Sequence, residues 1–378
     1  MNTKHLRVAA GKAGRWVPLV LVLGLFAGVL AGEKPGFSGG PDAGGPVPAL
    51  IHSLEVGRPV AYRSLTIVPI YRIDRTKSRN FVFLEEAVKN GWIEIAEIEG
   101  GRVPQVKISN LSSRTIFLLG GEILTGAKQD RILASDVLLA PGTRNLVAPV
   151  YCVEHGRWTA MPSSFTTKGN LGTFELRAKA LEKSGGAQSE IWDKVAAQNS
   201  QVGVASPTGA YQDAYESPAN KARIEEIEKK MSEIPRLMTD TIGVVIGLSG
   251  RVVSVDIFAD AEIFRIQWPK ILRSSALSAL SGRSDAGLSQ TAAADFLKGL
   301  AGRSYLVRKG LDLGMEHSCL DGTVNVQALI LDRDVIHLAA FPQDKDRAAV
   351  DRESDQRLRV IREEILRPSL IEIREKGL

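Results

Sequence analysis

The sequence contains only two cysteines and five histidines in 378 residues, and neither residue type is clustered. No CxxC pair occurs, and no set of cysteines, histidines and carboxylates has the spacing of a structural zinc site. The HExxH, GxGxxG and P-loop patterns are also absent. The sequence therefore offers no basis for a zinc protease, a dinucleotide-binding site or a P-loop NTPase. We expect no metal site, and no cofactor is indicated.

The two cysteines, Cys152 and Cys319, lie far apart in the chain. In an exported protein they can form a disulfide, which would tie the two halves of the chain together. Two separate buried thiols are an equally reasonable interpretation, because free cysteine behaves as a small hydrophobic residue. The sequence leaves both alternatives open.

The chain also lacks a strong excess of charge once its first residues are set aside. The full sequence has 48 Lys and Arg against 43 Asp and Glu. Residues 1–31 contain four of the basic residues and no acidic one, which leaves 44 basic and 43 acidic side chains in the remainder. A nucleic-acid-binding protein is expected to carry a basic surface, so nucleic acid is not an expected partner.

Residues 1–31 have the layout of a secretory signal peptide: a basic start, an apolar run over 16–30 and a small-residue cleavage pattern at 29–31. This predicts an extracytoplasmic protein, periplasmic or secreted. The alternative is an uncleaved membrane anchor, although a spanning helix needs roughly 20 apolar residues. No cysteine follows the apolar run, so lipid modification is unsupported. Residues 32–50 then read as a linker rich in glycine and proline.

Residues 51–165 have the pattern of a β-rich region. Short apolar runs alternate with turns that contain Gly, Pro, Asn or Ser, which is typical of an antiparallel sandwich or a partly open barrel. The expected strands are residues 64–71, 92–98, 103–109, 115–119, 132–139 and 145–153. Apolar residues at helical spacing predict one helix among them, with Asn80 as N-cap and Asn90-Gly91 as its end.

Residues 166–235 are expected to be helical. Helical spacing or composition marks three segments, which are residues 171–183, 190–198 and 224–234. In the last of them Ile224, Ile227 and Met231 share one face, while the charged residues form a solvated face.

Residues 236–345 return to an α/β pattern. Two β runs joined by Ser249-Gly250 predict a hairpin. Asp260 is then expected to cap a helix that Pro269 kinks or breaks. The remaining expected elements are a short helix over 295–300, strands over 324–331 and 335–340, and a helical tail over 346–378. The fold class is therefore α+β: an antiparallel, sandwich-like first half, a helical segment, and a second unit of β-hairpin and helix.

The densest group of polar residues lies within residues 120–131. Its members are Glu122, Lys128, Gln129, Asp130 and Arg131. A hairpin with a charged face, or paired charges that fix the strand register, would explain them structurally. In a binding site, Lys and Arg would hold phosphate or carboxylate groups. Glu122 or Asp130 would then act as a base, or bind a metal or a ribose hydroxyl. The paired glycines before Glu122 would let the backbone approach a ligand closely.

A second polar group follows at residues 154–157 and adds His155 and Arg157 to the candidate ligand-binding residues. Histidine is the natural proton carrier near neutral pH. A catalytic pair of Cys152 and His155 is disfavoured, because an odd separation along a strand places two side chains on opposite faces. His337 lies within an apolar run and is interpreted as a core or sheet-edge histidine.

Five segments together resemble a bacterial family. They are GGEILTGAKQDRIL, APVYCVEHGRW, GVVIGLSGRVVSVDIF, AEIFRIQWPKILRSSALSAL and HLAAFP. The chain resembles the ADP-ribosylglycohydrolase and rhodanese-phosphatase-superfamily-associated protein domain over residues 51–345. The resemblance brings no activity and no catalytic residues. It implies at most a link to ADP-ribose or NAD-derived metabolites.

Because no catalytic constellation is recognisable, we expect a non-catalytic ligand-binding or interaction module, with a small molecule or a protein as its partner. The alternative is an enzyme or processing domain that acts on a phosphate-bearing small molecule related to ADP-ribose or NAD. The enzyme hypothesis requires the candidate side chains, Glu122 and Asp130 above all, to converge on one concave pocket.

Overall fold

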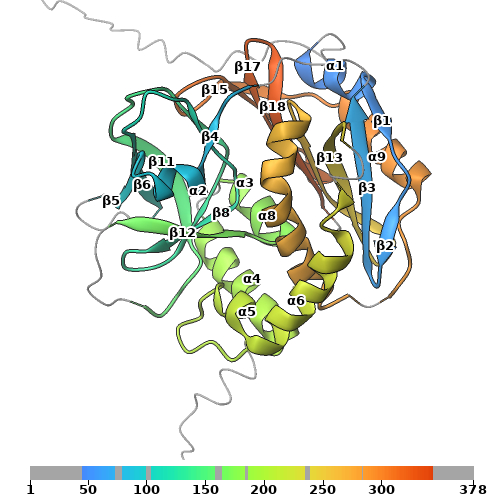
Figure 1. Ribbon diagram of the computed structural model, residues 1–378, viewed down its shortest axis with the longest axis horizontal. Helices are drawn as coiled ribbons and strands as arrows, with labels where there is room; N and C mark the ends of the chain where they lie inside the picture. The colour runs from blue at the N-terminus through green and yellow to red at the C-terminus, as the bar shows by residue number, and fades with distance from the viewer. Residues whose placement is uncertain are drawn as a thin grey trace, which may run out of the picture. The chain divides into compact units, whose positions relative to one another are not determined.

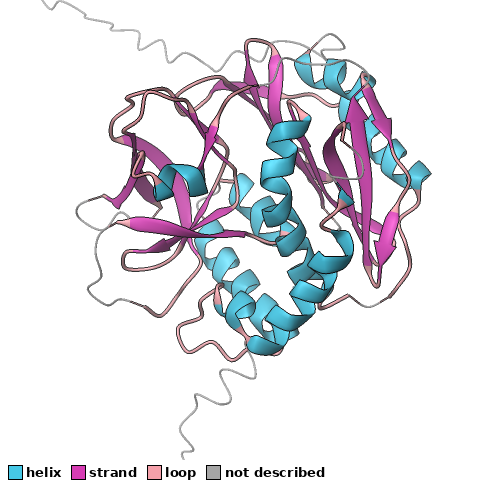
Figure 2. Ribbon diagram, viewed as in Figure 1, coloured by secondary structure: helices cyan, strands magenta, loops and turns pink. Residues whose placement is uncertain are grey.

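A computed structural model describes most of the chain from residue 45 to residue 343. The described residues are 45–72, 79–98, 104–157, 164–183, 186–234, 239–282 and 284–343. They form helices and three β-sheets, as Figures 1 and 2 show. The expected α+β, β-rich fold class is confirmed.

The largest sheet has nine strands, all paired antiparallel. In spatial order they are β1 (Leu54–Val56), β3 (Leu65–Arg72), β13 (Thr241–Leu248), β14 (Arg251–Phe258), β18 (Asp334–Pro342), β17 (Val324–Leu331), β16 (Met315–Leu320) and β15 (Leu306–Lys309), with β2 (Val60–Tyr62) also paired to β3. The predicted hairpin is confirmed as β13 and β14. Its turn residues Ser249 and Gly250 both have positive φ, as a tight hairpin turn requires.

Both faces of the central strands of this sheet are buried, which explains why these strands are continuous apolar runs. Val244 and Ile246 belong to one hydrophobic core, and Val245 between them belongs to the other. The first face is covered by α8 (Ala261–Ala279) and α3 (Phe174–Leu181). The second face is covered by α1 (Pro46–His52) and α9 (Gln290–Ala301).

The second sheet has six strands and closes on itself. Its strands, in spatial order, are β12 (Phe165–Leu171), β8 (Glu122–Gly126), β9 (Arg131–Leu133), β11 (Leu146–Cys152), β6 (Gln105–Asn110) and β5 (Ile93–Glu97). A bridge between Ala96 and Ser164 joins the two outer strands, so the sheet is a small barrel. Leu124 and Leu133 belong to a third core together with the other inward-facing residues, whereas Ile123 and Ile132 join the core around α8.

A third sheet of three strands lies beside the barrel. It consists of β10 (Val137–Leu139), β7 (Ile116–Leu118) and β4 (Val82–Phe83), with β4 parallel to β7. The short helix α2 (Leu84–Lys89) follows β4 directly and packs against β5, β7 and β12.

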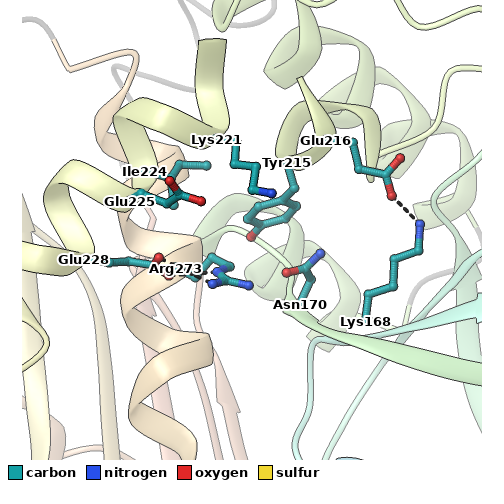
Figure 3. A pocket seen from close by; sticks show the side chains of 9 residues that line it. All are labelled: Lys168, Asn170, Tyr215, Glu216, Lys221, Ile224, Glu225, Glu228 and Arg273. Atoms are coloured by element: carbon teal, nitrogen blue, oxygen red, sulfur yellow. Dashed lines mark hydrogen bonds and ion pairs between the residues drawn. The ribbon is translucent and has the colours of Figure 1, made fainter. Parts of the chain in front are cut away.

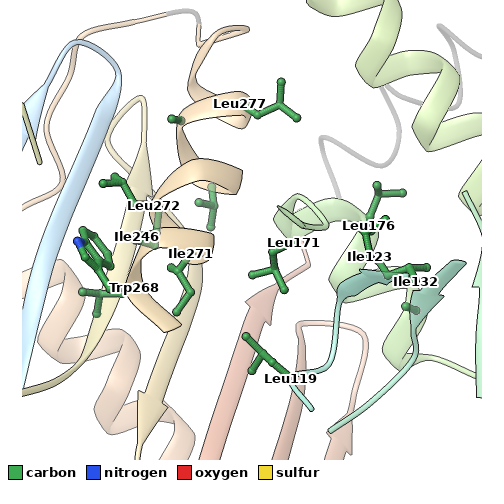
Figure 4. Close-up of a cluster of buried hydrophobic side chains, with 14 of the residues drawn as sticks. Leu119, Ile123, Ile132, Leu171, Leu176, Ile246, Trp268, Ile271, Leu272 and Leu277 are labelled. Carbon is green, nitrogen blue, oxygen red and sulfur yellow. The ribbon is translucent and has the colours of Figure 1, made fainter. Parts of the chain in front are cut away.

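The helical region packs against α8 and the barrel to form the most extensive core, part of which is drawn in Figure 4. Its helices are α4 (Ala187–Gln201), α5 (Asp213–Glu216) and α6 (Pro218–Met231). On α8, Ile271 and Leu272 are fully buried, and so is Leu176 of α3. The helix α8 contacts both β13 of the large sheet and β12 of the barrel. Side chains on α8 can therefore form hydrogen bonds or ion pairs with residues of either sheet.

Several expected elements need correction. The expected strand over 132–139 is two strands, β9 and β10, because residues 134–136 leave the ladder. The helix after Asn80 begins later than expected, with Phe83 at its N-cap, although it ends at Asn90 as predicted. Residues 165–171 form the barrel strand β12, where a helical region was expected.

Three further differences concern segment boundaries. The expected linker over 32–50 ends in helix α1, which begins at Pro46. Pro269 does not divide α8, which is one helix capped by the side chain of Asp260. The large sheet also combines β1 to β3 with strands of residues 241–342, so the first β-rich stretch is divided between this sheet and the two smaller ones.

Cys152 and Cys319 are both free, buried thiols, so the disulfide alternative is wrong. Burial raises the pKa of the Cys152 thiol to about 11, which keeps it protonated and unreactive. No helix among the described residues is long and apolar enough to cross a membrane. The expected signal peptide over 1–31 and the expected tail over 346–378 lie outside the described residues.

Candidate functional site

The turn before β8 carries Gly120, Gly121 and Glu122. Gly121 has a φ of +98°, a conformation that favours glycine. A Cβ atom on Gly121 would lie 2.5 Å from Cγ of Arg177, and one on Gly120 would lie 3.1 Å from the backbone of Asp136. The two glycines therefore give the protein's own Arg177 and Asp136 room to pack against the turn.

Arg177 and Asp136 belong to a fully buried ion network that also contains Asp256 and His337. Arg177 donates two hydrogen bonds to Asp256, with distances of 3.0 Å and 2.5 Å. Nδ1 of His337 lies 2.7 Å from Asp136, and its Nε2 lies 3.2 Å from Asp256. Oδ1 of Asp136 accepts a 2.7 Å hydrogen bond from the backbone N–H of Gly120. The network joins α3, β14 and β18 to the barrel.

The pKa shifts of Asp256 and His337 show how this network affects their ionisation. Burial by itself raises the pKa of Asp256, but Arg177 and then His337 outweigh it and hold the pKa well below its usual range. Burial lowers the pKa of His337, but Asp136 and then Asp256 outweigh it and raise the pKa to about 9. His337 is therefore an imidazolium at neutral pH. The expectation of a core histidine is confirmed, in an ionic form.

Glu122 belongs to a second buried network, formed with Lys270 of α8 and Glu85 of α2. Nζ of Lys270 contacts Oε1 of Glu122 and lies 3.0 Å from both carboxylate oxygens of Glu85. Oε2 of Glu122 accepts a 3.0 Å hydrogen bond from the N–H of Leu119. Burial raises the pKa of Glu122 to about 7, although Lys270 opposes this rise. Burial lowers the pKa of Lys270, but Glu122 and Glu85 outweigh it and raise that pKa.

Asp130 and Arg157 meet in a third cluster at the other end of β8. Nη2 of Arg157 lies 2.7 Å from Asp130 and 2.7 Å from Glu154. Arg157 also donates a 3.1 Å hydrogen bond to the carbonyl of Ala127. Burial raises the pKa of Asp130. The guanidinium thus joins the loop between β8 and β9 to the segment that follows β11.

The remaining candidates surround this cluster. Gln129 donates a 3.0 Å hydrogen bond to the carbonyl of His155. Arg131 donates a 3.0 Å hydrogen bond to the carbonyl of Gln129 and lies 3.6 Å from Glu97. Lys128 is exposed. The exposed imidazole of His155 packs edge-on against Trp192, with 4.4 Å between ring centroids.

The structure therefore brings six of the seven candidate residues to one end of the barrel and leaves Glu122 apart. Glu122 and Gly126 begin and end β8, and four residues of strand span about 13 Å. The clusters are paired internally, so their side chains are engaged with each other. Among the described residues, no group of three or more His, Cys, Asp or Glu side chains is placed to hold a metal ion. The ligand-binding role of the seven residues stays a prediction.

A surface pocket with a volume of about 260 Å³ lies between β12, α5, α6 and α8 (Figure 3). Three cations and three carboxylates line it, together with Asn170, Tyr215 and Ile224. The charged residues are Lys168, Lys221, Arg273, Glu216, Glu225 and Glu228. The net charge of the lining is therefore zero, and its chemistry depends on which groups are already paired.

Two of the three cations in the pocket have partners. Lys168 pairs with Glu216, and Arg273 lies 2.7 Å from Glu228. Lys221 has no ion pair with any residue that the structure describes. Its ammonium group is thus available to an anion that enters the pocket.

Asn170 and Tyr215 provide the neutral polar groups of the pocket. Asn170 is 6% exposed, and its Nδ2 donates a 2.7 Å hydrogen bond to Gln212. Its Oδ1 has no hydrogen-bond partner in the described part of the chain. The hydroxyl of Tyr215 donates to the carbonyl of Leu171 at 2.8 Å, and burial raises the pKa of this phenol well above its usual value. Tyr215 therefore stays neutral and presents its ring.

The strand β12 connects the pocket to two of the ion networks. The charge of Lys168 acts on Asp130 of the barrel-end cluster. On the same strand, a Cβ atom at Gly169 would lie 4.0 Å from the carboxylate of Glu85. Among the residues described, this pocket combines a cation without an ion pair, a buried acceptor without a partner and an aromatic ring, and it is our candidate functional site.

Sequence reasoning missed all the lining residues of this pocket, because they come from four separate elements. It also missed Asp136, Arg177, Asp256 and Lys270. A signal for two of them was present: Lys270 follows apolar residues on a helix face, and Asp256 interrupts the apolar run VVSVDIF. A charge in such a position is rarely buried without a partner.

Four residues of the two buried networks lie in the segments that carried the family resemblance; they are Glu122, Asp256, Lys270 and His337. Residues 53–341 match the family described as the ARG and Rhodanese-Phosphatase-superfamily-associated Protein domain. The chain belongs to this family. A search of curated proteins and a search of solved structures each gave no match.

Proposed function

We propose that this protein is a non-catalytic binding module that holds a small, phosphate-bearing and hydroxyl-rich molecule in the pocket between β12, α5, α6 and α8. One observation carries the proposal. The unpaired ammonium of Lys221 and the unpartnered Oδ1 of Asn170 line the same pocket, with the ring of Tyr215 between them (Figure 3). A ligand that satisfies both groups needs an anionic end and a hydrogen-bond donor.

The chemistry of the lining favours a sugar phosphate among such ligands. A phosphate group would bind Lys221, in a charge-assisted contact. Sugar hydroxyls would donate to Asn170 and to Glu225, which also lines the pocket. The ring of Tyr215 would pack against the apolar face of the sugar. A pocket of about 260 Å³ is at the small end of ligand sites, which suits one ribose phosphate group better than a whole dinucleotide.

A binding role fits this pocket better than catalysis. Its lining contains no Cys, Ser or His, and two of its three carboxylates, Glu216 and Glu228, are held in ion pairs. Glu122, whose pKa is raised to about 7, and the imidazole of His337 are engaged in buried networks and do not line the pocket. The family name, interpreted as ADP-ribosylglycohydrolase-associated, supports an ADP-ribose-related ligand. The alternative to a binding module is an enzyme that acts on the same class of ligand.

Isothermal titration of the full-length protein with ribose 5-phosphate, ADP-ribose and inorganic phosphate tests the proposal. Lys221→Gln is expected to weaken binding about tenfold or more, because a hydrogen bond to a charged group contributes about 1.5–3 kcal/mol. Lys229→Gln is the matched control, since Lys229 is exposed on the same helix and does not line the pocket. Absence of heat with all three compounds, or equal affinity in both variants, would contradict the proposal. Turnover of ADP-ribose, followed by phosphorus NMR, would favour the enzyme instead.

The proposal places the module outside the cytoplasm, on the pattern of residues 1–31. Mass spectrometry of the protein purified from fractionated cells checks this location. We expect a new N-terminus after residue 31 and recovery outside the cytoplasm. An intact N-terminus in the membrane fraction would indicate the anchored alternative.

A further inference from the structure

The outer strand β15 of the large sheet is unusually unprotected. All four of its residues are exposed, and β16 is its only strand partner among the residues described. An edge strand leaves a row of backbone N–H and C=O groups unpaired, and native proteins normally cover or disrupt such edges. The hairpin of β15 and β16 is nevertheless held in place, because Leu313 in its turn donates a 3.0 Å hydrogen bond to Leu138 of β10.

Exposed apolar side chains concentrate on the same hairpin. Of the seven large apolar side chains that are exposed in the described residues, four lie on β15 and β16. They are Leu306, Val307, Met315 and Leu320. Lys309 is paired with Met315 across the hairpin, so Val307 and Met315 share one face of it. An edge with exposed apolar side chains marks an interaction surface.

The charges on β15 restrict which strand can pair with it. Arg308 and Lys309 are exposed and have no ion pair with any described residue. An added strand would therefore need apolar side chains on the Val307 face and an acidic side chain opposite Arg308. A second copy of β15 does not meet this requirement, because antiparallel pairing of two copies brings their four basic residues together.

We propose that residues 369–376 of this chain, SLIEIREK, add to β15 as an antiparallel strand, which replaces the helix expected for this part of the tail. Pairing Glu372 with Arg308 places Ile373 opposite Val307 and Ile371 opposite Lys309. Ile371 and Ile373 then cover the face that exposes Val307 and Met315, and Glu372 neutralises Arg308. Strand addition of this kind uses backbone hydrogen bonds for affinity and alternate side chains for specificity.

The path of the chain permits this pairing. Gln343, the last described residue, donates a hydrogen bond to Thr323 beside the turn between β16 and β17. The chain thus leaves the sheet at the end where Leu306 lies. A strand added to β15 would stand four strand spacings from β18, which is about 19 Å. Residues 344–368 can span several times that distance when extended.

Disulfide trapping in the full-length protein tests the proposal. Val307→Cys combined with Ile373→Cys is expected to cross-link within one chain under mild oxidation, since directly opposed side chains are close enough. Val307→Cys with Glu372→Cys is the matched control, because residue 372 would point to the other face; it should cross-link at least fivefold less. The native thiols of Cys152 and Cys319 are buried and are present in both variants, so any cross-linking through them is the same in both. Equal cross-linking in the two variants, no cross-link, or only cross-linked dimers would overturn the proposal.

Hydrogen exchange provides a second readout that needs no cysteine. In the full-length protein, backbone amides of β15 are expected to exchange at least tenfold more slowly than in the Ile371→Asp, Ile373→Asp double variant. Exchange in β13, at the centre of the sheet, should be the same in both proteins. Equal exchange of β15 in the two proteins would overturn the proposal.

Discussion

Replacing Glu122 with glutamine is expected to remove a pH dependence of stability that arises from burial of this carboxyl group. Glu122 is 1% exposed, and burial raises its pKa from an ordinary 4.5 to about 7. A carboxyl group whose pKa is higher in the folded state binds its proton more tightly there. The stabilisation that comes from this tighter proton binding is therefore complete below pH 4.5, and it is lost as the pH rises to about 7.

The size of this effect follows from the pKa change. Each tenfold change in proton affinity corresponds to about 1.4 kcal/mol, so ionisation of Glu122 reduces the free energy of unfolding by about 3 kcal/mol. Glutamine keeps the shape of the side chain and an oxygen that accepts the hydrogen bond from Leu119. The other titrating groups, such as Asp256 and His337, are present in both proteins and largely cancel in the difference.

Urea unfolding of both proteins between pH 4 and pH 8 measures this difference directly. The free energy of unfolding of the natural protein minus that of Glu122→Gln should fall by about 3 kcal/mol across the range. The same comparison with Glu94→Gln, an exposed site on β5, controls for the loss of one surface carboxylate. A difference that rises with pH would mean that the ion pair with Lys270 outweighs burial, and would refute the reasoning.

Three further predictions concern the buried networks. Arg177→Met should lower the free energy of unfolding by about 3–5 kcal/mol in urea, because it leaves Asp256 buried without its main partner; a loss below 1 kcal/mol would contradict the assignment of this pair. Gly121→Ala should lower the melting temperature more than Gly91→Ala does, because only the first combines positive φ with a 2.5 Å contact, whereas Gly91 has positive φ and open space; equal losses would show that Arg177 does not depend on the glycine. For His337, whose folded pKa of about 9 lies above its ordinary 6.5, the stabilisation is complete below pH 6.5 and is lost as the pH rises through 9. The free energy of unfolding of the natural protein minus that of His337→Gln should thus fall by about 3 kcal/mol between pH 6 and pH 10, and no fall would mean a neutral imidazole.

The local elements of the fold were predictable from the sequence because their signals are short-range. The hairpin around Ser249-Gly250, the cap at Asp260 and the buried face of Ile224 and Ile227 each depend on residues within a few positions of one another. Strand β12 was missed because its sequence, FTTKGNL, is polar and contains a glycine. It is a strand because it pairs with β8 from a distant part of the chain, with a register shift near that glycine.

The candidate site was predictable only in part, for the same physical reason. The density of polar residues over 120–131 and 154–157 identified segments that contain buried charge. The side chains that pair with these charges are distant in the sequence: Lys270 is 148 residues from Glu122. His337 is 201 residues from Asp136. The glycine pair indicated close approach correctly, but the approaching groups are Arg177 and Asp136. The pocket itself depends on the packing of α6 and α8 against β12, which no local pattern encodes.

The binding role of this pocket is tested most directly by titrating ribose 5-phosphate into the natural protein, Lys221→Gln and Lys229→Gln under identical conditions. The account predicts saturable binding by the natural protein and by Lys229→Gln, with affinity weaker by about tenfold or more in Lys221→Gln. Binding that is unchanged in Lys221→Gln would contradict the account, and so would the absence of binding in the natural protein.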